Sequence, residues 1–93
     1  MEITREDFGN KGQFVIRKDN QEIGKMTYSW SGEDKFIIDH TEVNDNHEGN
    51  GYGKQMVMEA VKFARENNVK ILPLCPFAKH IFDKNRDLED VRF

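Results

Sequence analysis

Three glycines at every second position, Gly49, Gly51 and Gly53, separate a strand-like pattern from a helical one. The residues up to Val43 read as a strand, and an amphipathic helical pattern begins at Gln55. A glycine-rich turn between a strand and a helix leaves backbone N–H groups free at the helix N-terminus, where the peptide dipoles favour negative charge. Glycine has no Cβ atom, so a ligand can approach the main chain closely. The pattern predicts a phosphate site, and a connection that merely turns the chain is the alternative.

The common nucleotide-binding motifs do not fit this loop. A P-loop ends in Gly-Lys followed by Ser or Thr, whereas Gly53-Lys54 is followed by Gln55, and Glu48 stands where the first glycine would be. A dinucleotide-binding fold places its glycine turn after the first strand and needs a longer array of strands and helices. Neither motif therefore identifies the ligand.

The rest of the chain predicts an α/β fold with a mainly antiparallel sheet. Because the crossover from strand to helix to strand is right-handed, the strands on either side of the helix are expected to be parallel. Pro73 lacks an amide donor and indicates an edge or distorted strand, which would leave residues 69–75 open to pairing. Strands are expected over 14–18, 22–30, 35–43 and 69–75, and helices from Gln55 to about Asn67 and over 77–84.

Each helix is expected to bury one face. In the first, Val57, Ala60, Val61 and Ala64 follow the helical period and form an apolar stripe. In the second, Phe77, Ile81 and Phe82 are expected to pack inward.

Composition excludes several classes of function. The chain has 93 residues, expected to form one domain over 1–93, and a net charge of −3 without blocks of like charge. This balance argues against a nucleic-acid or membrane-surface partner. No apolar run approaches the roughly 18 residues of a membrane span, and the first residues do not resemble a signal peptide, so a cytoplasmic location is expected. Cys75 and the histidines lack the compact spacing of a zinc site, and no metal is expected.

The loop sequence Glu48-Gly49-Asn50-Gly51-Tyr52-Gly53 resembles the pyrophosphate-binding motif of the GNAT acetyltransferases. That motif has Arg or Gln, two residues, Gly, one residue, and then Gly or Ala at the opening of a helix. The flanking segments His40-Thr41-Glu42-Val43 and Leu74-Cys75-Pro76-Phe77 are similar to those of very small, single-domain members. The resemblance implies a truncated GNAT-like fold, a twisted and mainly antiparallel sheet with one parallel crossover pair. It also implies acetyl transfer from acetyl-CoA, the co-substrate, to an amine.

The same resemblance implies where acetyl-CoA would bind. The pantetheine arm would run beside the main chain from Thr41 to Val43. Main-chain amides of the loop would hold the pyrophosphate, and these belong to Glu48, Gly49, Asn50, Gly51, Tyr52, Gly53 and Lys54. Glu48 replaces the usual Arg or Gln and brings a carboxylate near the diphosphate. The chain lacks the segments that usually wrap the acceptor, so the amine is left open between a small molecule and a peptide or protein lysine.

Acetyl transfer to an amine also needs a base. The ordinary pKa of a lysine ammonium is about 10.4, so only a small fraction of such amines is nucleophilic at neutral pH unless a base removes the proton. Alternation along a strand places Ile38, His40 and Glu42 on one face, so His40 or Glu42 is the candidate base. The alternatives are a histidine satisfied by its neighbours and a solvated carboxylate. A main-chain amide near Val43, left unpaired by a bulge, would suit the carbonyl oxygen of the thioester.

Cys75 lies at the end of the last predicted strand, beside the expected position of the thioester. It is a candidate proton donor for the CoA thiolate, a candidate acetyl acceptor activated by Lys79, His80 or the next helix N-terminus, or a buried structural thiol. The segment 77–84 contains no tyrosine, the residue that often protonates the thiolate in larger acetyltransferases. A CoA-binding or sensing module without turnover is therefore the second hypothesis, and a protein-interaction domain is the third.

Overall fold

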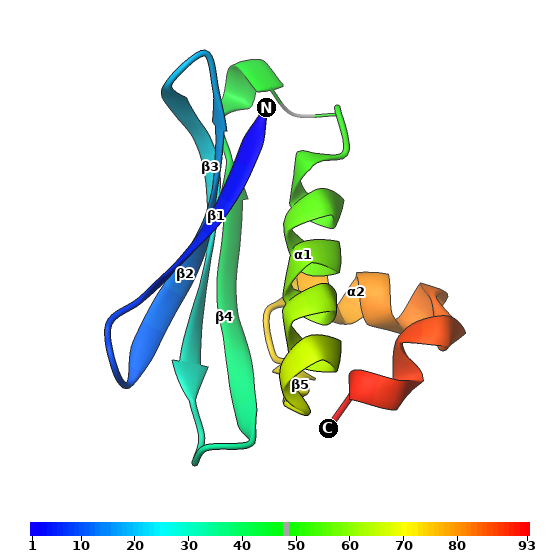
Figure 1. Cartoon of the computed structure of the whole chain (residues 1–93). Helices are drawn as coiled ribbons and strands as arrows, with labels where there is room; N and C mark the ends of the chain where they lie inside the picture. The colour runs from blue at the N-terminus through cyan, green and yellow to red at the C-terminus, as the bar shows by residue number, and fades with distance from the viewer. Residues whose placement is uncertain (48) are drawn as a thin grey trace.

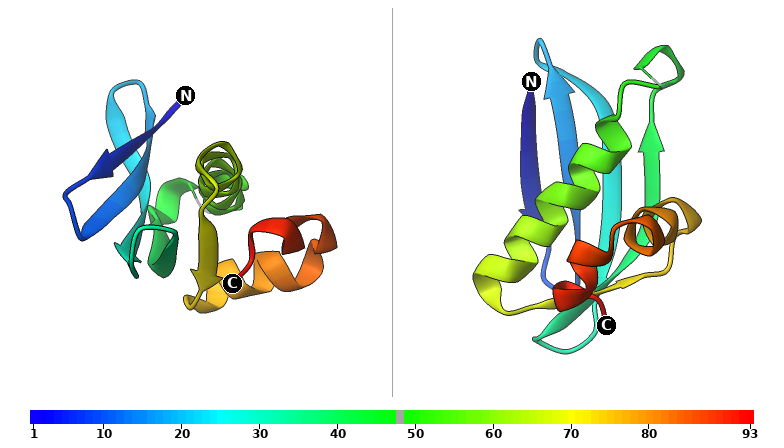
Figure 2. Two further views of the ribbon diagram at one scale, coloured as in Figure 1. Left: turned by 60° about the horizontal axis from the view of Figure 1, so that its bottom comes forward. Right: turned by 90° about the vertical axis from the view of Figure 1, so that its right-hand side faces the viewer.

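The computed structural model describes residues 1–47 and 49–93 and has two layers, a sheet and the helices that cover one of its faces (Figure 1). The long helix α1 runs across the sheet, and α2 lies beside it (Figure 2). In chain order the elements are β1 (Glu2–Asp7), β2 (Lys11–Lys18), β3 (Gln21–Trp30), β4 (Lys35–Val43), the 3-10 turn η1 (Asp45–His47), α1 (Tyr52–Asn67), β5 (Lys70–Pro73), α2 (Pro76–Lys84) and the 3-10 turn η2 (Arg86–Val91).

The sheet follows the order of the chain, β1-β2-β3-β4-β5. Neighbouring strands from β1 to β4 are antiparallel, and β4 and β5 are parallel. The expected sheet, mainly antiparallel with one parallel crossover pair, is therefore confirmed. The expected edge position of β5 and the bounds of β4 are confirmed as well, whereas β1 was not predicted and α1 begins at Tyr52 rather than Gln55.

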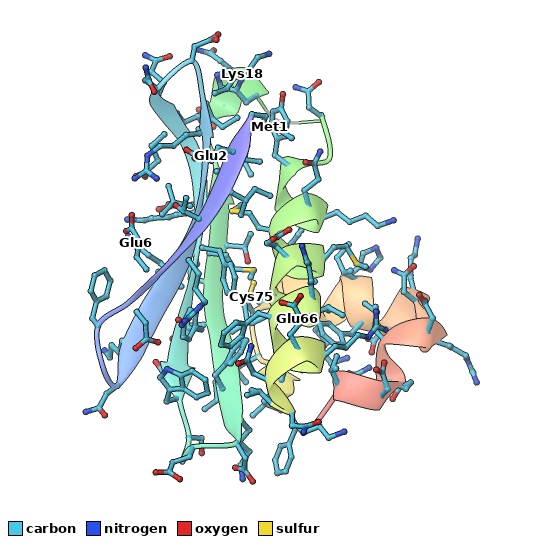
Figure 3. All side chains as sticks on the ribbon, in the orientation of Figure 1. Met1, Glu2, Glu6, Lys18, Glu66 and Cys75 are labelled. Atoms are coloured by element: carbon cyan, nitrogen blue, oxygen red, sulfur yellow. The ribbon has the colours of Figure 1, made fainter. Side chains whose placement is uncertain are left out.

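The core lies between the sheet and α1, where the side chains in Figure 3 fill the space. The predicted stripe of α1 is buried in it, together with Met56. In α2 the buried residues are Ala78 and Phe82, so the expectation for Phe82 is confirmed. The expectation for Phe77 and Ile81 is wrong in part, because Phe77 is 40% exposed and Ile81 only half-buried. No helix within 1–47 or 49–93 is long and apolar enough to cross a bilayer.

A β-bulge interrupts β4 at Asp39. Tyr28 of β3 pairs with Ile38, and the preceding residue Thr27 pairs with His40, so Asp39 is the extra residue on β4. A bulge of this kind shifts the alternation of side chains by one position. Even-numbered residues of β4 therefore face the helices before the bulge, and odd-numbered residues face them after it.

This shift decides which residues of β4 face the helices. Ile38 is buried before the bulge, and Thr41 and Val43 take the half-buried positions after it, while His40 and Glu42 are exposed. The expectation that Ile38 shares a face with His40 and Glu42 is therefore wrong. The bulge also lies at position 39 rather than near Val43, because a single extra residue leaves no mark in the hydrophobic pattern.

A polar cluster fastens β1 to the sheet. The hydroxyl of Tyr28 donates to Asp7 Oδ2 over 2.8 Å and accepts from Arg5 Nη1 over 2.9 Å. The indole of Trp30 donates to the same Asp7 oxygen over 2.7 Å. Burial raises the pKa of Tyr28 to about 12, whereas the hydrogen bond from Trp30 holds the pKa of Asp7 below its ordinary value. Gly12 of β2 lies opposite Tyr28 of β3, and because it has no side chain it leaves room for the phenol ring.

The outer edge of β5 is covered by the chain itself. Phe93 donates its N–H to the carbonyl of Ile71 over 2.8 Å, and Arg92 forms a parallel bridge with Ile71. The expectation of an open edge over 69–75 is therefore wrong at Ile71.

Candidate functional site

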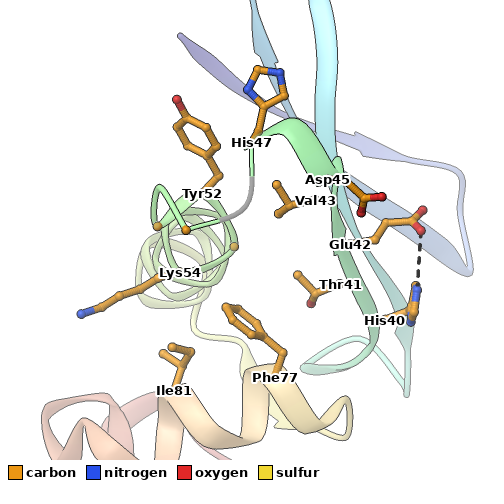
Figure 4. A pocket seen from close by; sticks show the side chains of 13 residues that line it. His40, Thr41, Glu42, Val43, Asp45, His47, Tyr52, Lys54, Phe77 and Ile81 are labelled. Atoms are coloured by element: carbon orange, nitrogen blue, oxygen red, sulfur yellow. Dashed lines mark ion pairs between the residues drawn. The ribbon is translucent and has the colours of Figure 1, made fainter.

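The two parallel strands separate halfway along β4. Their pairing ends where Ile38 lies opposite Pro73, and the N–H of Cys75 then donates to the carbonyl of Ile38 over 3.0 Å. β4 continues to Val43 beyond this point. The chain thus forms an opening bordered by the second half of β4 on one side and by α1 and α2 on the other (Figure 4).

The main chain of β4 has hydrogen-bonding groups directed toward this opening. The N–H of Asn44 donates to the carbonyl of Ile23 on β3 over 2.8 Å. Because successive residues of a strand point their N–H and C=O groups to alternate sides, the main chain of Thr41 and Val43 is directed away from β3. These groups face the opening and are placed to bind an extended amide-containing ligand.

A cavity of about 720 Å³ occupies the opening. Its size suits a cofactor-sized ligand. It joins the second half of β4, the glycine loop that contains Gly49 and Gly51, the first turn of α1 and the first turns of α2 (Figure 4). The residues that line it are His40, Thr41, Glu42, Val43, Asp45, His47, Gly49, Gly51, Tyr52, Gly53, Lys54, Phe77 and Ile81.

The glycine loop leads directly into α1. Gly51 is the residue before the helix, with a left-handed φ of 77°, and Gly49 has a φ of 84°. The first turn of the helix closes with the N–H of Gln55 donating to the carbonyl of Gly51 over 3.0 Å. The N–H groups of Tyr52 and Gly53 precede this bond and belong to the unpaired start of a helix. The first turn carries no acidic side chain that would repel an anion, so the N-terminus of α1 favours negative charge.

Most of the loop residues predicted to bind the cofactor line the cavity. These are Gly49, Gly51, Tyr52, Gly53 and Lys54. The side chain of Lys54 extends away from the opening (Figure 4). Asn50 is exposed, and its amide donates to the carbonyl of His47 over 3.1 Å. Glu48 lies outside the described residues.

His40 and Glu42 lie together on the outer face of β4. Nε2 of His40 is 3.8 Å from Oε2 of Glu42, and Nζ of Lys25 is 3.7 Å from Oε1. Both side chains are exposed at the rim of the cavity (Figure 4). The structure therefore brings the two candidate bases together, on the face opposite α1.

Cys75 lies behind the wall of the cavity. It is 5% exposed, and its thiol donates to Oγ1 of Thr41 over 3.5 Å. Thr41 lines the cavity, whereas Cys75 is not among the described lining residues. Cys75 also stands directly before the first turn of α2, as expected from the sequence. Lys79, one cation considered for lowering the thiol pKa, is exposed and pairs with Asp83 over 2.9 Å.

Four lining residues were not predicted as site residues. Asp45 and His47 belong to η1, which the sequence does not announce, and Phe77 and Ile81 were expected in the core. Phe77 follows Cys75-Pro76 at the start of a helix beside the predicted thioester position, and this place in the sequence is the signal that could have identified it as a site residue. Among residues 1–47 and 49–93, no cluster of side chains is arranged to hold a metal ion.

Comparisons with known proteins agree with this architecture. The model of one family, the GCN5-related N-acetyl-transferases, matches residues 13–91. A solution structure of a GCN5-like candidate N-acetyltransferase from Staphylococcus aureus is 38% identical, with a TM-score of 0.74. The match covers 99% of this chain and 87% of that one. A search of curated proteins gave no significant match.

Two more distant structures share the fold. A ribosomal-protein-alanine N-acetyltransferase from Brucella melitensis biovar Abortus is 19% identical, with a TM-score of 0.65 over 81% of this chain and 62% of that one. A candidate streptothricin acetyltransferase from Bacillus anthracis, in complex with acetyl coenzyme A, is 23% identical, with a TM-score of 0.59. That match covers 70% of this chain and 38% of the other. The chain thus spans most of the Staphylococcus protein and much less of the larger ones.

Proposed function

Because the chain belongs to the GCN5-related N-acetyltransferase family, we propose that it transfers an acetyl group from acetyl-CoA to an amine. One observation carries the proposal: a single cavity joins the glycine loop at the start of α1 to the second half of β4, where the strand has separated from β5. An anion site and an extended main chain then lie along one path. A ligand with a diphosphate at one end and two amides in its arm matches that path.

The proposed binding mode uses main-chain groups. Amides between Gly49 and Lys54 hold the pyrophosphate, supported by the dipole of α1. The pantetheine amides bond the main chain of Thr41 and Val43. A peptide N–H near Val43 donates to the thioester oxygen, in a hydrogen bond that strengthens as negative charge develops. Glu48 and Asn50 belong to the proposed loop by the motif resemblance.

The proposed reaction is direct transfer. The amine nitrogen attacks the thioester carbon, a C–N bond forms and the C–S bond to CoA breaks. His40 or Glu42 takes the proton that the amine loses. The CoA thiolate takes a proton from Cys75, with the Thr41 hydroxyl between them as the relay, since the thiol is 3.5 Å from that oxygen. The cycle closes when the base releases its proton to water and Cys75 regains one.

A CoA-binding module without turnover is the second candidate. Two observations favour it: residues 77–84 contain no tyrosine, and Cys75 is not among the described residues that line the cavity. Such a module would use the same loop and strand for binding and would leave the thioester intact.

Two measurements separate these functions. Titration of ¹⁵N-labelled protein with CoA is expected to shift the amide resonances of Gly49, Gly51 and Gly53. If none of the three resonances changes, CoA is excluded as the ligand of this loop. Incubation with acetyl-CoA and a panel of amines, followed by thiol release, then tests turnover. Intact mass analysis shows whether an acetyl group, about 42 Da, is carried on the protein and lost in Cys75→Ala. CoA binding without thiol release or an adduct would favour the binding module.

A further inference from the structure

Gly53 of α1 and Phe77 of α2 meet beside the cavity. Gly53 is the second residue of α1 and is buried, and Phe77 is the second residue of α2. A Cβ atom on Gly53 would stand 2.7 Å from Cζ and 2.9 Å from Cε2 of the Phe77 ring. Carbon atoms in contact normally lie about 3.5 to 4 Å apart. The ring therefore rests directly on the main chain of α1, and only glycine leaves room for it.

The other side of the same ring faces the opening. Phe77 lines the cavity and is 40% exposed, and Figure 4 shows its ring between α1 and Thr41 of β4. The main chain of α1 stops the ring from moving away from β4. The distance between the ring and the strand thus fixes the width of the cavity at Thr41.

We propose that Phe77 is a positioning residue for the pantetheine arm of CoA and that Gly53 is required to keep its ring in place. This inference rests on the proposed function. The arm carries methylene groups and a dimethyl carbon, which an aromatic ring packs against well. With Phe77 on one side and the Thr41 main chain on the other, the arm is held flat between an apolar wall and a hydrogen-bonding wall.

The test is a double-mutant cycle read by the dissociation constant of CoA. Phe77→Ala removes the apolar wall and weakens CoA binding about tenfold, as expected for one lost aromatic contact. Gly53→Ala pushes the ring toward β4, which narrows the cavity and weakens binding by a similar factor. In Gly53→Ala combined with Phe77→Ala, the ring is absent and the Gly53 change costs less than about twofold.

A fragment of the ligand separates this role from a general loss of structure. The compound 3′-phospho-ADP is the nucleotide half of CoA and lacks the arm, so Phe77→Ala should leave its affinity unchanged. Phe8→Ala removes another exposed phenylalanine, in the connection between β1 and β2, and is the matched control that binds CoA as the wild type does. Phe77→Leu retains an apolar wall and should fall between wild type and Phe77→Ala. Thermal melting of each variant confirms that it is folded.

Two results would overturn the inference alone. One is CoA affinity unchanged in Phe77→Ala, and the other is an equal loss from Gly53→Ala with and without the ring, which would place its effect in the loop main chain. Wild-type protein that binds neither CoA nor 3′-phospho-ADP would overturn the proposed function and this inference together.

Discussion

The thiol of Cys75 is joined to the cavity through Thr41, whose hydroxyl lies 3.5 Å from the sulfur. Cys75 is 5% exposed and stands at the start of α2, whereas Thr41 lies on β4 after the bulge and lines the cavity. Two elements far apart in sequence thus bring the proposed proton donor and its proposed relay into contact. The proposed mechanism treats the two residues as one functional unit, and this can be tested.

Cys75→Ala is expected to lower kcat about a hundredfold, the usual contribution of a positioned general acid, while CoA affinity stays within about twofold. Thr41→Val keeps the shape of the side chain and removes the hydroxyl. If the proton passes through Thr41, this variant loses a similar factor, and the double variant loses no more than either single one. Steady-state thiol release measures kcat. Unchanged kcat in Cys75→Ala would leave Cys75 with a structural role.

Substitution of His40 and Glu42 should identify the base. Glu42→Gln and His40→Gln keep similar shapes and remove the ability to take the amine proton. The true base, when replaced, should cost about a hundredfold in kcat and abolish the acid limb of the pH–rate profile. The other substitution should act only by disturbing the 3.8 Å pair and should retain that limb. Two retained acid limbs would exclude both residues as the base.

Gly51 offers a test of loop geometry. Its φ of 77° is left-handed, so Gly51→Ala should lower the free energy of unfolding by about 1 kcal/mol. Gly51→Asn should lose less, because asparagine tolerates this conformation better. No heavy atom of the described residues lies within 4 Å of the added Cβ, so this loss reflects backbone strain. Both variants put a Cβ at the anion site and should weaken CoA binding alike. Urea unfolding and calorimetric titration measure the two effects.

Equal stability of the alanine and asparagine variants would contradict the left-handed conformation. Unchanged CoA affinity in both variants would contradict a close approach of the phosphates at this position.

Tyr28→Phe should reveal the buried hydroxyl. At neutral pH the variant should lose about 1 kcal/mol of unfolding free energy, because Asp7 loses a hydrogen bond. The pKa of Tyr28 is about 12 in the folded protein and 10.0 in the ordinary group, so the unfolded chain releases its proton first. The stabilisation is present below pH 10.0 and is lost as the pH rises toward about 12.

Urea unfolding at about pH 8 and about pH 11 gives the measurement. The difference between wild type and Tyr28→Phe should shrink at the higher pH. A difference that stays constant across this range would show that the phenol does not titrate above its ordinary range. Tyr52→Phe changes the other tyrosine of the chain and serves as the control.

The parts of the fold that carry a repeated pattern could be predicted from the sequence. β4 is rich in β-branched and aromatic residues, and the apolar stripe of α1 appears at the helical period, so the bounds of β4 and the buried face of α1 were predicted correctly. The parallel pair then follows from their order along the chain. β1 was not predicted because Glu2–Asp7 is an edge strand of mostly polar residues. Its pairing with β2 is reinforced by hydrogen bonds from Tyr28 and Trp30, which come much later in the sequence.

The site was predictable where the main chain acts and less so where side chains act. The spacing of the glycines predicts the loop, because glycine is favoured where φ is positive. The position of Phe77 depends on the space above Gly53, which only the packing of α2 on α1 determines. Cys75 was placed beside the expected thioester, but its separation from the cavity by Thr41 follows from a bulge with no sequence signal.

The bulge at Asp39 changes which residue numbers of β4 face inward. Residues of even number serve the core up to Ile38, and residues of odd number turn inward from Thr41 onward. An alignment or a design that keeps every residue of β4 but treats it as a regular strand would place His40 and Glu42 inward, in the positions of Thr41 and Val43. The core half of the strand would be placed correctly, whereas the half that lines the cavity would be turned inside out.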